Sequence, residues 1–260
     1  MSIVAALVEQ SLVLANNDPG PVENLLRSKV KLPDQWLYLA VAFGAFSGAA
    51  FAARRGFDLV GVLGLAAAQG IGGLLLAQIL LQQGVPEVLK DRWYLIVVVV
   101  AALTAFFLAD LITRAMESLL IIDALSLGLL CAIGVNQALR ALPDNPEVSA
   151  VFLGVITAVG GGILRDILSG RAPDVLRPGI FTATAALIGA IIFVLLVDLT
   201  DATKNFALIL TVAVVATIRL LSHWLHWETR GARDYSDRLI RSRPKPSDVT
   251  NQSDDPGAKQ

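Results

Sequence analysis

The sequence predicts an all-α membrane protein in which seven transmembrane helices form two inverted three-helix repeats followed by a seventh helix. Hydrophobic residues make up 55% of the 260 residues and charged residues only 17%, whereas a soluble chain carries about a quarter charged residues. The hydrophobic residues gather in long uncharged runs, and a glycine-rich phrase occurs twice along the chain. Mean hydropathy is +0.66, so these observations together indicate an integral membrane protein.

The composition also argues against several classes of function. A formal net charge of −1 disfavours a nucleic-acid binder, which would need a strongly basic surface. A single cysteine, Cys131, rules out a disulfide scaffold and a multi-cysteine metal cluster. No phosphate-binding GxxxxGK[ST] loop or HExxH metal site occurs, and His223 and His226 lie beside tryptophans at one helix end, as in an aromatic belt. We therefore expect no enzyme, no catalytic residues, no resident metal and no cofactor.

Seven stretches approach the roughly 20 apolar residues that a helix needs to cross the hydrocarbon layer. The first three and the sixth carry no charged residue, and the fourth contains Asp123. The fifth continues through Arg165 and Asp166 to residue 169. The seventh contains Arg219, whose stem is expected to extend to the cytoplasmic headgroups. The stretches are 36–53, 59–82, 93–109, 118–138, 148–164, 179–197 and 205–227.

The two ends of the chain differ in composition. Residues 1–35 are predicted to be an extracytoplasmic segment, whose short apolar run 3–8 favours an interfacial amphipathic helix over a cleaved signal. Residues 228–260 are polar and contain three prolines, which predicts a disordered tail. Six basic residues at 230–245 follow the last span closely. They place the C-terminus in the cytoplasm and, after seven spans, the N-terminus outside.

An internal repeat divides the membrane region into residues 36–110 and 118–198. Each half contains a glycine cluster, an apolar half-helix that ends in Ile-Leu, and a Pro-acid-Val-Leu-base phrase at 86–90 or 173–177. Corresponding helices of the two copies are three spans apart, and an odd number of membrane crossings makes them run in opposite directions. The halves are therefore expected to be related by a pseudo-two-fold axis in the membrane plane. The seventh span, 205–227, belongs to neither half. A chance match between glycine-rich helices is the alternative.

The glycine clusters fall near the middle of the second and fifth spans. Consecutive glycines weaken a helix by about 1 kcal/mol each relative to alanine, and freed backbone groups would line a cavity. We expect a functional break at both clusters, and a seam of small residues that packs two helices closely is the alternative. The residues expected at the two kinks are Gly70, Gly72, Gly73, Gly160, Gly161 and Gly162.

Charged residues follow the second glycine cluster by one turn. Arg165 and Asp166 lie at a depth where an ionisable group marks a pathway or a pair. They are expected either to line a pore or to form a structural salt bridge, in which Arg165 binds Asp166 or Asp123. Asp123 and Ser47 are the other polar residues expected along the pore. The arginines expected to anchor anionic lipid are Arg54, Arg55, Arg171 and Arg177.

The residues quoted above resemble those of a known family. Phe46-Ser47-Gly48, the segment 53–61 and the first glycine cluster are similar to the first repeat of the trimeric intracellular cation (TRIC) channel family, in its prokaryotic branch. Asp123-Ala124-Leu125, Gly134 and the segment 160–168 resemble its second repeat. The resemblance covers roughly residues 36–227. The first repeat departs from the usual pattern, because Leu74 replaces a third glycine and Ala77-Gln78 stand where Arg-Asp often occurs.

The resemblance implies a homotrimer in a prokaryotic inner membrane, surrounded by lipids and without a nucleic-acid partner. It implies that each subunit encloses a pore lined by the second and fifth helices and permeable to potassium and sodium ions. Related bacterial proteins are associated with glycine uptake. A small-solute carrier is therefore the alternative function, and a membrane scaffold without flux is the third.

Overall fold

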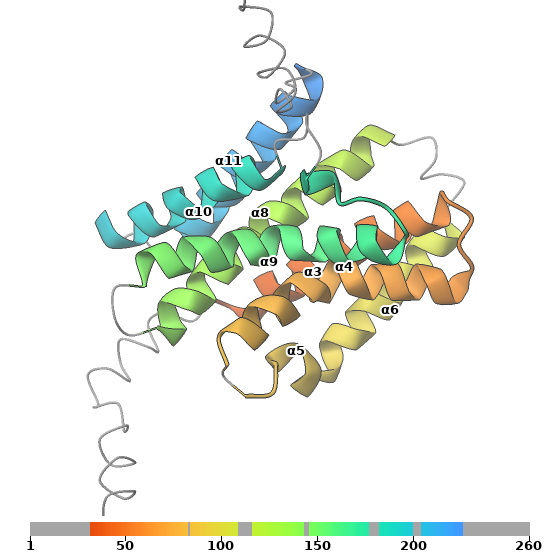
Figure 1. The fold of residues 1–260 in the computed structure, drawn as a ribbon, viewed down its shortest axis with the longest axis horizontal. Coiled ribbons are helices and arrows are strands. Elements are labelled where there is room, and N and C mark those ends of the chain that lie inside the picture. The colour runs from red at the N-terminus through yellow and green to blue at the C-terminus, as the bar shows by residue number, and fades with distance from the viewer. Residues whose placement is uncertain are drawn as a thin grey trace, which may run out of the picture.

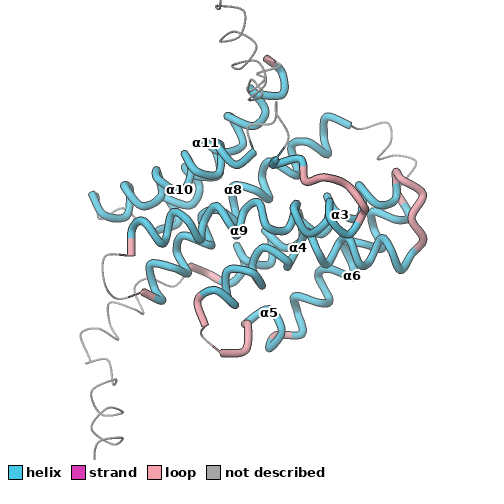
Figure 2. Tube along the Cα trace, in the orientation of Figure 1, coloured by secondary structure: helices cyan, strands magenta, loops and turns pink. Residues whose placement is uncertain are grey.

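The computed structural model describes residues 32–82, 84–108, 116–142, 146–176, 182–199 and 204–225. In these ranges every regular element is helical and none is a strand (Figure 2). The predicted N-terminal segment up to residue 31 and the predicted tail lie outside the described residues. The longer helices are α3 (Asp34–Ala53), α4 (Leu59–Leu80), α6 (Arg92–Phe107), α8 (Met116–Ala141), α9 (Glu147–Leu168), α10 (Thr182–Leu199) and α11 (Lys204–Trp224).

Each longer helix overlaps one of the seven stretches predicted from hydropathy. Five of them, α3, α4, α8, α9 and α11, are long and apolar enough to cross a membrane. The apolar parts of α6 and α10, 92–107 and 182–197, are shorter. The all-helical, multi-pass membrane class is thereby confirmed. Two short elements, α5 (Glu87–Lys90) and the 3₁₀ turn η1 (Asp174–Leu176), follow the two helices that contain the glycine clusters.

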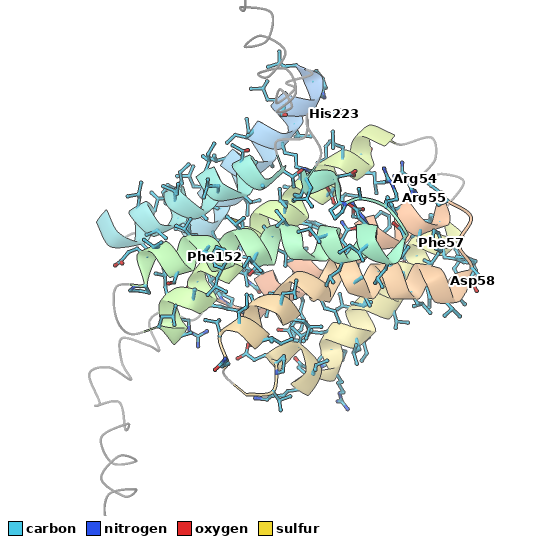
Figure 3. The ribbon with its side chains drawn as sticks, in the orientation of Figure 1. Arg54, Arg55, Phe57, Asp58, Phe152 and His223 are labelled. Carbon is cyan, nitrogen blue, oxygen red and sulfur yellow. The ribbon has the colours of Figure 1, made fainter. Side chains whose placement is uncertain are left out.

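Local sequence signals define the turn between α3 and α4. Gly56 adopts a φ of 74°, a left-handed conformation that favours glycine, just after the end of α3. The Asp58 side chain then accepts a hydrogen bond of 2.8 Å from the Gly61 backbone N–H and caps α4. Figure 3 shows Arg54, Arg55, Phe57 and Asp58 together at this end of the molecule. The chain therefore reverses direction in five residues and keeps α3 against α4.

Helices α4 and α9 pack against each other in the middle of the molecule (Figure 1). α3 contacts α4, α6 and α8. α10 contacts α8, α9 and α11, and α11 contacts α8 as well as α10. The interior is built largely of alanine, valine and leucine side chains. Small side chains let the helix axes approach closely, which is the common mode of packing in membrane helices.

The expected breaks at the glycine clusters are not found. Every residue of α4 from 59 to 80 and of α9 from 147 to 168 is α-helical, and so the prediction that these helices lose helical structure at their midpoints is wrong. The glycines instead allow backbone contact. A methyl group on Gly73 would collide with the Thr157 carbonyl oxygen, and one on Gly161 would collide with the Gln69 carbonyl oxygen. The packing seam, the alternative from the sequence, is the observed arrangement.

We expect the variants Gly73→Ala and Gly161→Ala to lower the free energy of unfolding by about 1–3 kcal/mol, because each methyl group would meet a helix backbone that has no room to move. The measurement is unfolding of the purified protein in detergent. Gly64→Ala is the matched control. Gly64 also lies on α4, but an added methyl group there would have no neighbouring atom within 4 Å, so the variant should be neutral or raise stability by up to about 1 kcal/mol. Equal effects at all three positions would contradict the seam.

Candidate functional site

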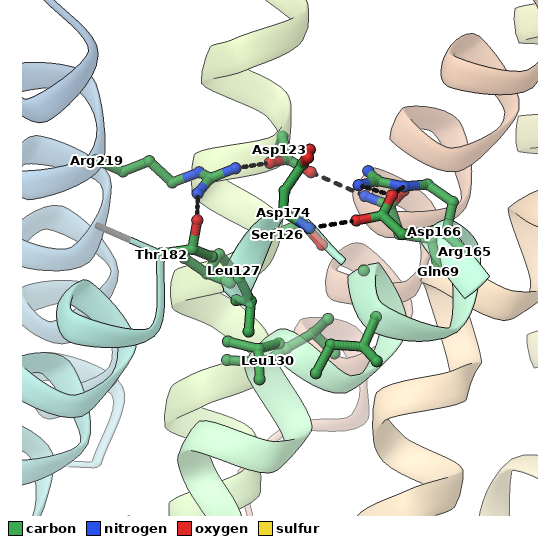
Figure 4. A pocket seen from close by; sticks show the side chains of 15 residues that line it. Gln69, Asp123, Ser126, Leu127, Leu130, Arg165, Asp166, Asp174, Thr182 and Arg219 are labelled. Atoms are coloured by element: carbon green, nitrogen blue, oxygen red, sulfur yellow. Dashed lines mark hydrogen bonds and ion pairs between the residues drawn. The ribbon is translucent and has the colours of Figure 1, made fainter. Parts of the chain in front are cut away.

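A half-buried carboxylate, Asp123 of α8, lies where four helices meet. Its Oδ1 accepts a hydrogen bond of 2.9 Å from the Ser47 hydroxyl of α3 and one of 2.8 Å from the Gln69 amide Nε2 of α4. Its Oδ2 accepts a hydrogen bond of 2.5 Å from Arg219 Nη2 of α11 (Figure 4). The structure thus brings Ser47 to Asp123, two of the residues expected along the pore, and Arg219 supplies the charge that balances the carboxylate.

Arg165 and Asp166 form an ion pair within α9. Arg165 Nε and Nη2 donate to Asp166 Oδ1 at 2.9 and 2.7 Å, and Asp166 Oδ2 accepts from the Asp174 backbone N–H at 2.9 Å. Asp166 is 2% exposed, so the pair fixes η1 against the end of α9. Arg165 Nη1 also donates to Gln69 Oε1 at 2.9 Å. Of the two predicted salt bridges, the one to Asp166 is present, and Arg165 reaches Asp123 only through Gln69.

The expected orientation of Arg219 is wrong. Its guanidinium does not extend along the helix to the headgroups but turns inward, to Asp123 and to the Thr182 hydroxyl of α10. A buried carboxylate without a counter-charge is very unfavourable in hydrocarbon, which explains why α11 supplies one. Two guanidinium groups thereby balance two carboxylates. We call this set the charged network; its members are Ser47, Gln69, Asp123, Arg165, Asp166, Thr182 and Arg219.

The sequence did not predict the hydrogen bonds and the ion pair that Gln69, Thr182 and Arg219 contribute to this network. Gln69 and Thr182 are uncharged and lie in otherwise apolar stretches, so only their polarity marked them. Gln69 is 5% exposed and links Asp123 to Arg165. Arg219 carried the clearest signal, because a charge in an apolar span calls for a partner such as Asp123.

Two cavities adjoin the charged network. The central cavity, of about 70 Å³, is lined by charged network residues and by apolar side chains such as Leu127 and Leu130 (Figure 4). The mouth cavity, of about 260 Å³, shares Asp123 and Arg219 with it and extends to His223 at the end of α11. A water molecule needs roughly 10–15 Å³ of such space, so the central cavity has room for several. Polar space therefore reaches the interior of the helical assembly.

The six predicted kink glycines do not share one role. Gly162 lines the central cavity, and a methyl group there would meet no atom within 4 Å. Gly73 and Gly161 form the close crossing of α4 and α9 already described. The others also have close neighbours: Gly70 contacts Ala45 of α3, Gly72 contacts Leu164, and Gly160 contacts Leu76.

Three arginines surround the buried ring of Phe51 near the mouth cavity. The guanidinium carbons of Arg55, Arg165 and Arg171 lie 4.2, 4.4 and 5.7 Å from the ring centroid. Desolvation, together with repulsion from Arg171 and Arg165, lowers the pKa of the Arg55 guanidinium below its ordinary value. Two of the predicted lipid anchors, Arg55 and Arg171, therefore belong to a cluster of arginines around an aromatic ring. Arg171 also forms an ion pair of 3.7 Å with Asp174.

Metal-binding geometry is not found in the described ranges. Within them, no group of three or more histidine, cysteine, aspartate or glutamate side chains is placed to hold a metal ion. Cys131 is buried in α8, where its thiol donates to the Ala186 carbonyl at 3.2 Å.

Comparison with known proteins identifies relatives in bacteria. A UPF0126 membrane protein of Deinococcus radiodurans is 37% identical over 158 residues, which is 60% of this chain and 72% of the relative. The inner membrane protein YadS of Escherichia coli K12 is 36% identical over 159 residues, 60% of this chain and 75% of YadS. The membrane protein YvgT of Bacillus subtilis is 30% identical over 72% of this chain and 90% of YvgT.

Solved structures give the same fold. A structure from a study of conductance through TRIC cation channels matches with a TM-score of 0.69 and 33% identity, over 77% of this chain and 97% of that one. The TRIC orthologue from Rhodobacter sphaeroides matches with a TM-score of 0.67 and 31% identity, over 73% of this chain and 96% of that one. A family described as glycine transporters matches residues 36–110 and 120–198. The chain is therefore a multi-pass integral membrane protein that belongs to the glycine transporter family and shares the fold of the TRIC cation channels.

Proposed function

We propose that the protein is a monovalent-cation channel, permeable to potassium and sodium ions, with a pore inside each subunit between α4, α8 and α9. The observation that carries the proposal is the central cavity, a space for several water molecules beside the charged network. The similarity to TRIC cation channels supports it. Asp123 would offset the positive charge of Arg219 beside the path, while Gln69 and Ser47 offer polar groups in place of hydration.

Seven spans in two inverted repeats are part of this proposal. If the Ile-Leu ends of α4 and α9 are superimposed, Gly73 falls on Gly161 and Gln69 falls on Thr157. The contacts of these residues are reciprocal, because Gly73 meets the Thr157 carbonyl and Gly161 meets the Gln69 carbonyl. Such a reciprocal pair is expected of two copies related by a two-fold axis. The family match over residues 36–110 and again over 120–198 supports the same duplication.

The proposed assembly is a homotrimer in a bacterial inner membrane, surrounded by lipids. The Rhodobacter sphaeroides orthologue is described as trimeric, and the relative YadS as an inner membrane protein. We infer that the mouth cavity opens to the cytoplasm, because Arg54, Arg55 and Arg171 lie near that end. The N-terminus would then lie outside and the C-terminus inside.

A glycine carrier is the second candidate function. The cavity walls carry both cationic and anionic side chains, Arg165 and Arg219 beside Asp123 and Asp174, and this pairing suits a zwitterion. The description of the matched family names the same solute.

Purified protein in planar bilayers and liposomes separates the candidates. A channel gives unitary currents that reverse near the potassium equilibrium potential in a potassium gradient. A carrier gives saturable uptake of radiolabelled glycine without unitary currents. A protein with neither current nor uptake would refute both proposals and leave a scaffold.

We expect Gly162→Leu to reduce the potassium current at least tenfold while leaving the thermal unfolding temperature nearly unchanged, because the side chain would occupy the central cavity without displacing backbone. Gly64→Leu is the matched control, since this glycine also has no atom within 4 Å of an added methyl group but lies on the exposed face of α4. A full current in Gly162→Leu would show that ions do not pass through this cavity.

We expect Asp123→Asn to lower potassium conductance several-fold and to reduce the preference for potassium over chloride, because it leaves the Arg219 guanidinium unpaired beside the path. The double variant Asp123→Asn/Arg219→Gln restores neutrality and should recover part of the conductance. Reversal potentials in potassium chloride gradients measure the selectivity. If the single and double variants have the same selectivity as the original protein, Asp123 does not act on permeating ions.

A further inference from the structure

An apolar groove lies on the surface of the molecule between α3 and α6, next to α8. Its volume is about 530 Å³, and its lining is aliphatic and aromatic apart from Thr104. The Thr104 hydroxyl donates to the Val100 carbonyl of the same helix at 2.7 Å, so it needs no further partner. Ala42 and Phe46 of α3 and Val100 and Ala101 of α6 are among the residues that line the groove.

The second repeat has an equivalent surface, and helix α11 covers it. α11 packs against α8 and α10, on the opposite side of the molecule from α6 (Figure 1). Two glycines permit this contact. A methyl group on Gly128 of α8 would lie 2.9 Å from the Val212 Cα, and one on Gly189 of α10 would collide with the Val215 side chain. At both positions α11 therefore approaches more closely than a larger residue would allow.

The contacts of Gly48 and Gly134 relate α3 to α8. A methyl group on Gly48 would lie 3.2 Å from the Ala66 Cα of α4, and one on Gly134 would lie 3.1 Å from the Gly154 Cα of α9. With the Ile-Leu ends of α4 and α9 superimposed, Ala66 falls on Gly154. Gly48 and Gly134 therefore hold equivalent places in the two repeats, and the other residues of α3 and α8 can be matched from this pair.

This correspondence places Ala42 at the position of Gly128. In the third helix of each repeat, superimposing the aspartates at 110 and 198 places Ala101 at the position of Gly189. Both alanines line the apolar groove. The groove is thus the first-repeat counterpart of the surface that α11 covers, and its small side chains would let a helix approach in the same way.

We propose that the apolar groove is a contact between subunits, in which an apolar helix of a second copy of this chain takes the place that α11 holds in the second repeat. The inference rests on the homotrimer of the proposed function and names the face through which that assembly forms. A ring of three identical subunits is closed by heterologous contacts, so the groove of one subunit receives a different face of the next.

The shape of the surface favours a helix over a lipid acyl chain as the occupant. Alanines at the two glycine-equivalent positions serve close backbone approach, which a flexible acyl chain does not require. A stable contact between copies buries about 800 Å² on each, and the apolar surface does extend beyond the groove. Leu39 lies one turn before Ala42, Phe107 lies one turn after Thr104, and both are exposed. The Rhodobacter sphaeroides orthologue, which shares this fold, is described as trimeric.

A matched pair of variants on α6 tests the contact. Val100 lines the groove and Val99 does not, yet both side chains are exposed in the subunit. We expect Val100→Trp to lower the trimer fraction at least tenfold, because the indole would fill the groove, whereas Val99→Trp should stay trimeric. Light scattering in detergent, at a concentration where the original protein is trimeric, measures the fraction. Circular dichroism should show the original helical content in both variants, since neither indole enters the core.

Thiol reactivity reads the occupancy of the groove with smaller side chains. Val100→Cys and Val99→Cys are treated with methyl methanethiosulfonate in detergent and analysed by mass spectrometry; the native Cys131 is buried. In the trimer we expect Val100→Cys to react at least tenfold more slowly than Val99→Cys, because the second copy covers it.

The outcomes separate this contact from the proposed assembly. If Val100→Trp stays trimeric and the two thiols react equally fast, the groove faces lipid, and the contact is refuted while the homotrimer stands. If the original protein is monomeric, both are refuted. Slow reaction of Val100→Cys in a monomeric sample would assign the groove to another part of the same chain and would also overturn the contact. Neither measurement uses current, so the result does not depend on whether the protein conducts.

Discussion

The structure depends on the neutralisation of one carboxylate, Asp123, inside an apolar helical assembly. In hydrocarbon an isolated carboxylate is costly, and the cost falls only when the charge is paired and its lone pairs accept hydrogen bonds. Asp123 meets both conditions by drawing one group from each of α3, α4 and α11. The same interaction therefore fixes the positions of three helices around α8. It also creates the polar surface that a pathway through the subunit requires.

Much of the architecture could be predicted from the sequence, because long apolar stretches have few alternatives in a membrane. The helix positions follow from hydropathy, and the turn between α3 and α4 follows from Gly56 and Asp58. Arg165 and Asp166 were recognisable as a pair, because adjacent opposite charges at membrane depth must compensate each other. These features depend on local sequence, where composition and spacing carry the information.

The remainder depends on contacts between distant residues. The glycine clusters suggested a break because three or more glycines weaken a helix in isolation, but tertiary packing of α4 against α9 supplies the missing stability. Arg219 was expected at the headgroups because its partner lies 96 residues away in the chain. Gln69 gives no signal of its own, since one glutamine in an apolar helix has no preferred partner until the fold brings Asp123 and Arg165 to it.

The close crossing of α4 and α9 has a mechanical consequence. Where two helix backbones touch through glycine, no side chain lies between them that can change rotamer and let one helix slide past the other. The two helices are therefore held against each other at their midpoints. Helix α11 is joined to α8 in two ways, by the ion pair of Arg219 with Asp123 and by the close approach of Gly128 to the Val212 backbone. A rearrangement of this subunit would thus have to move α4 and α9 as one unit.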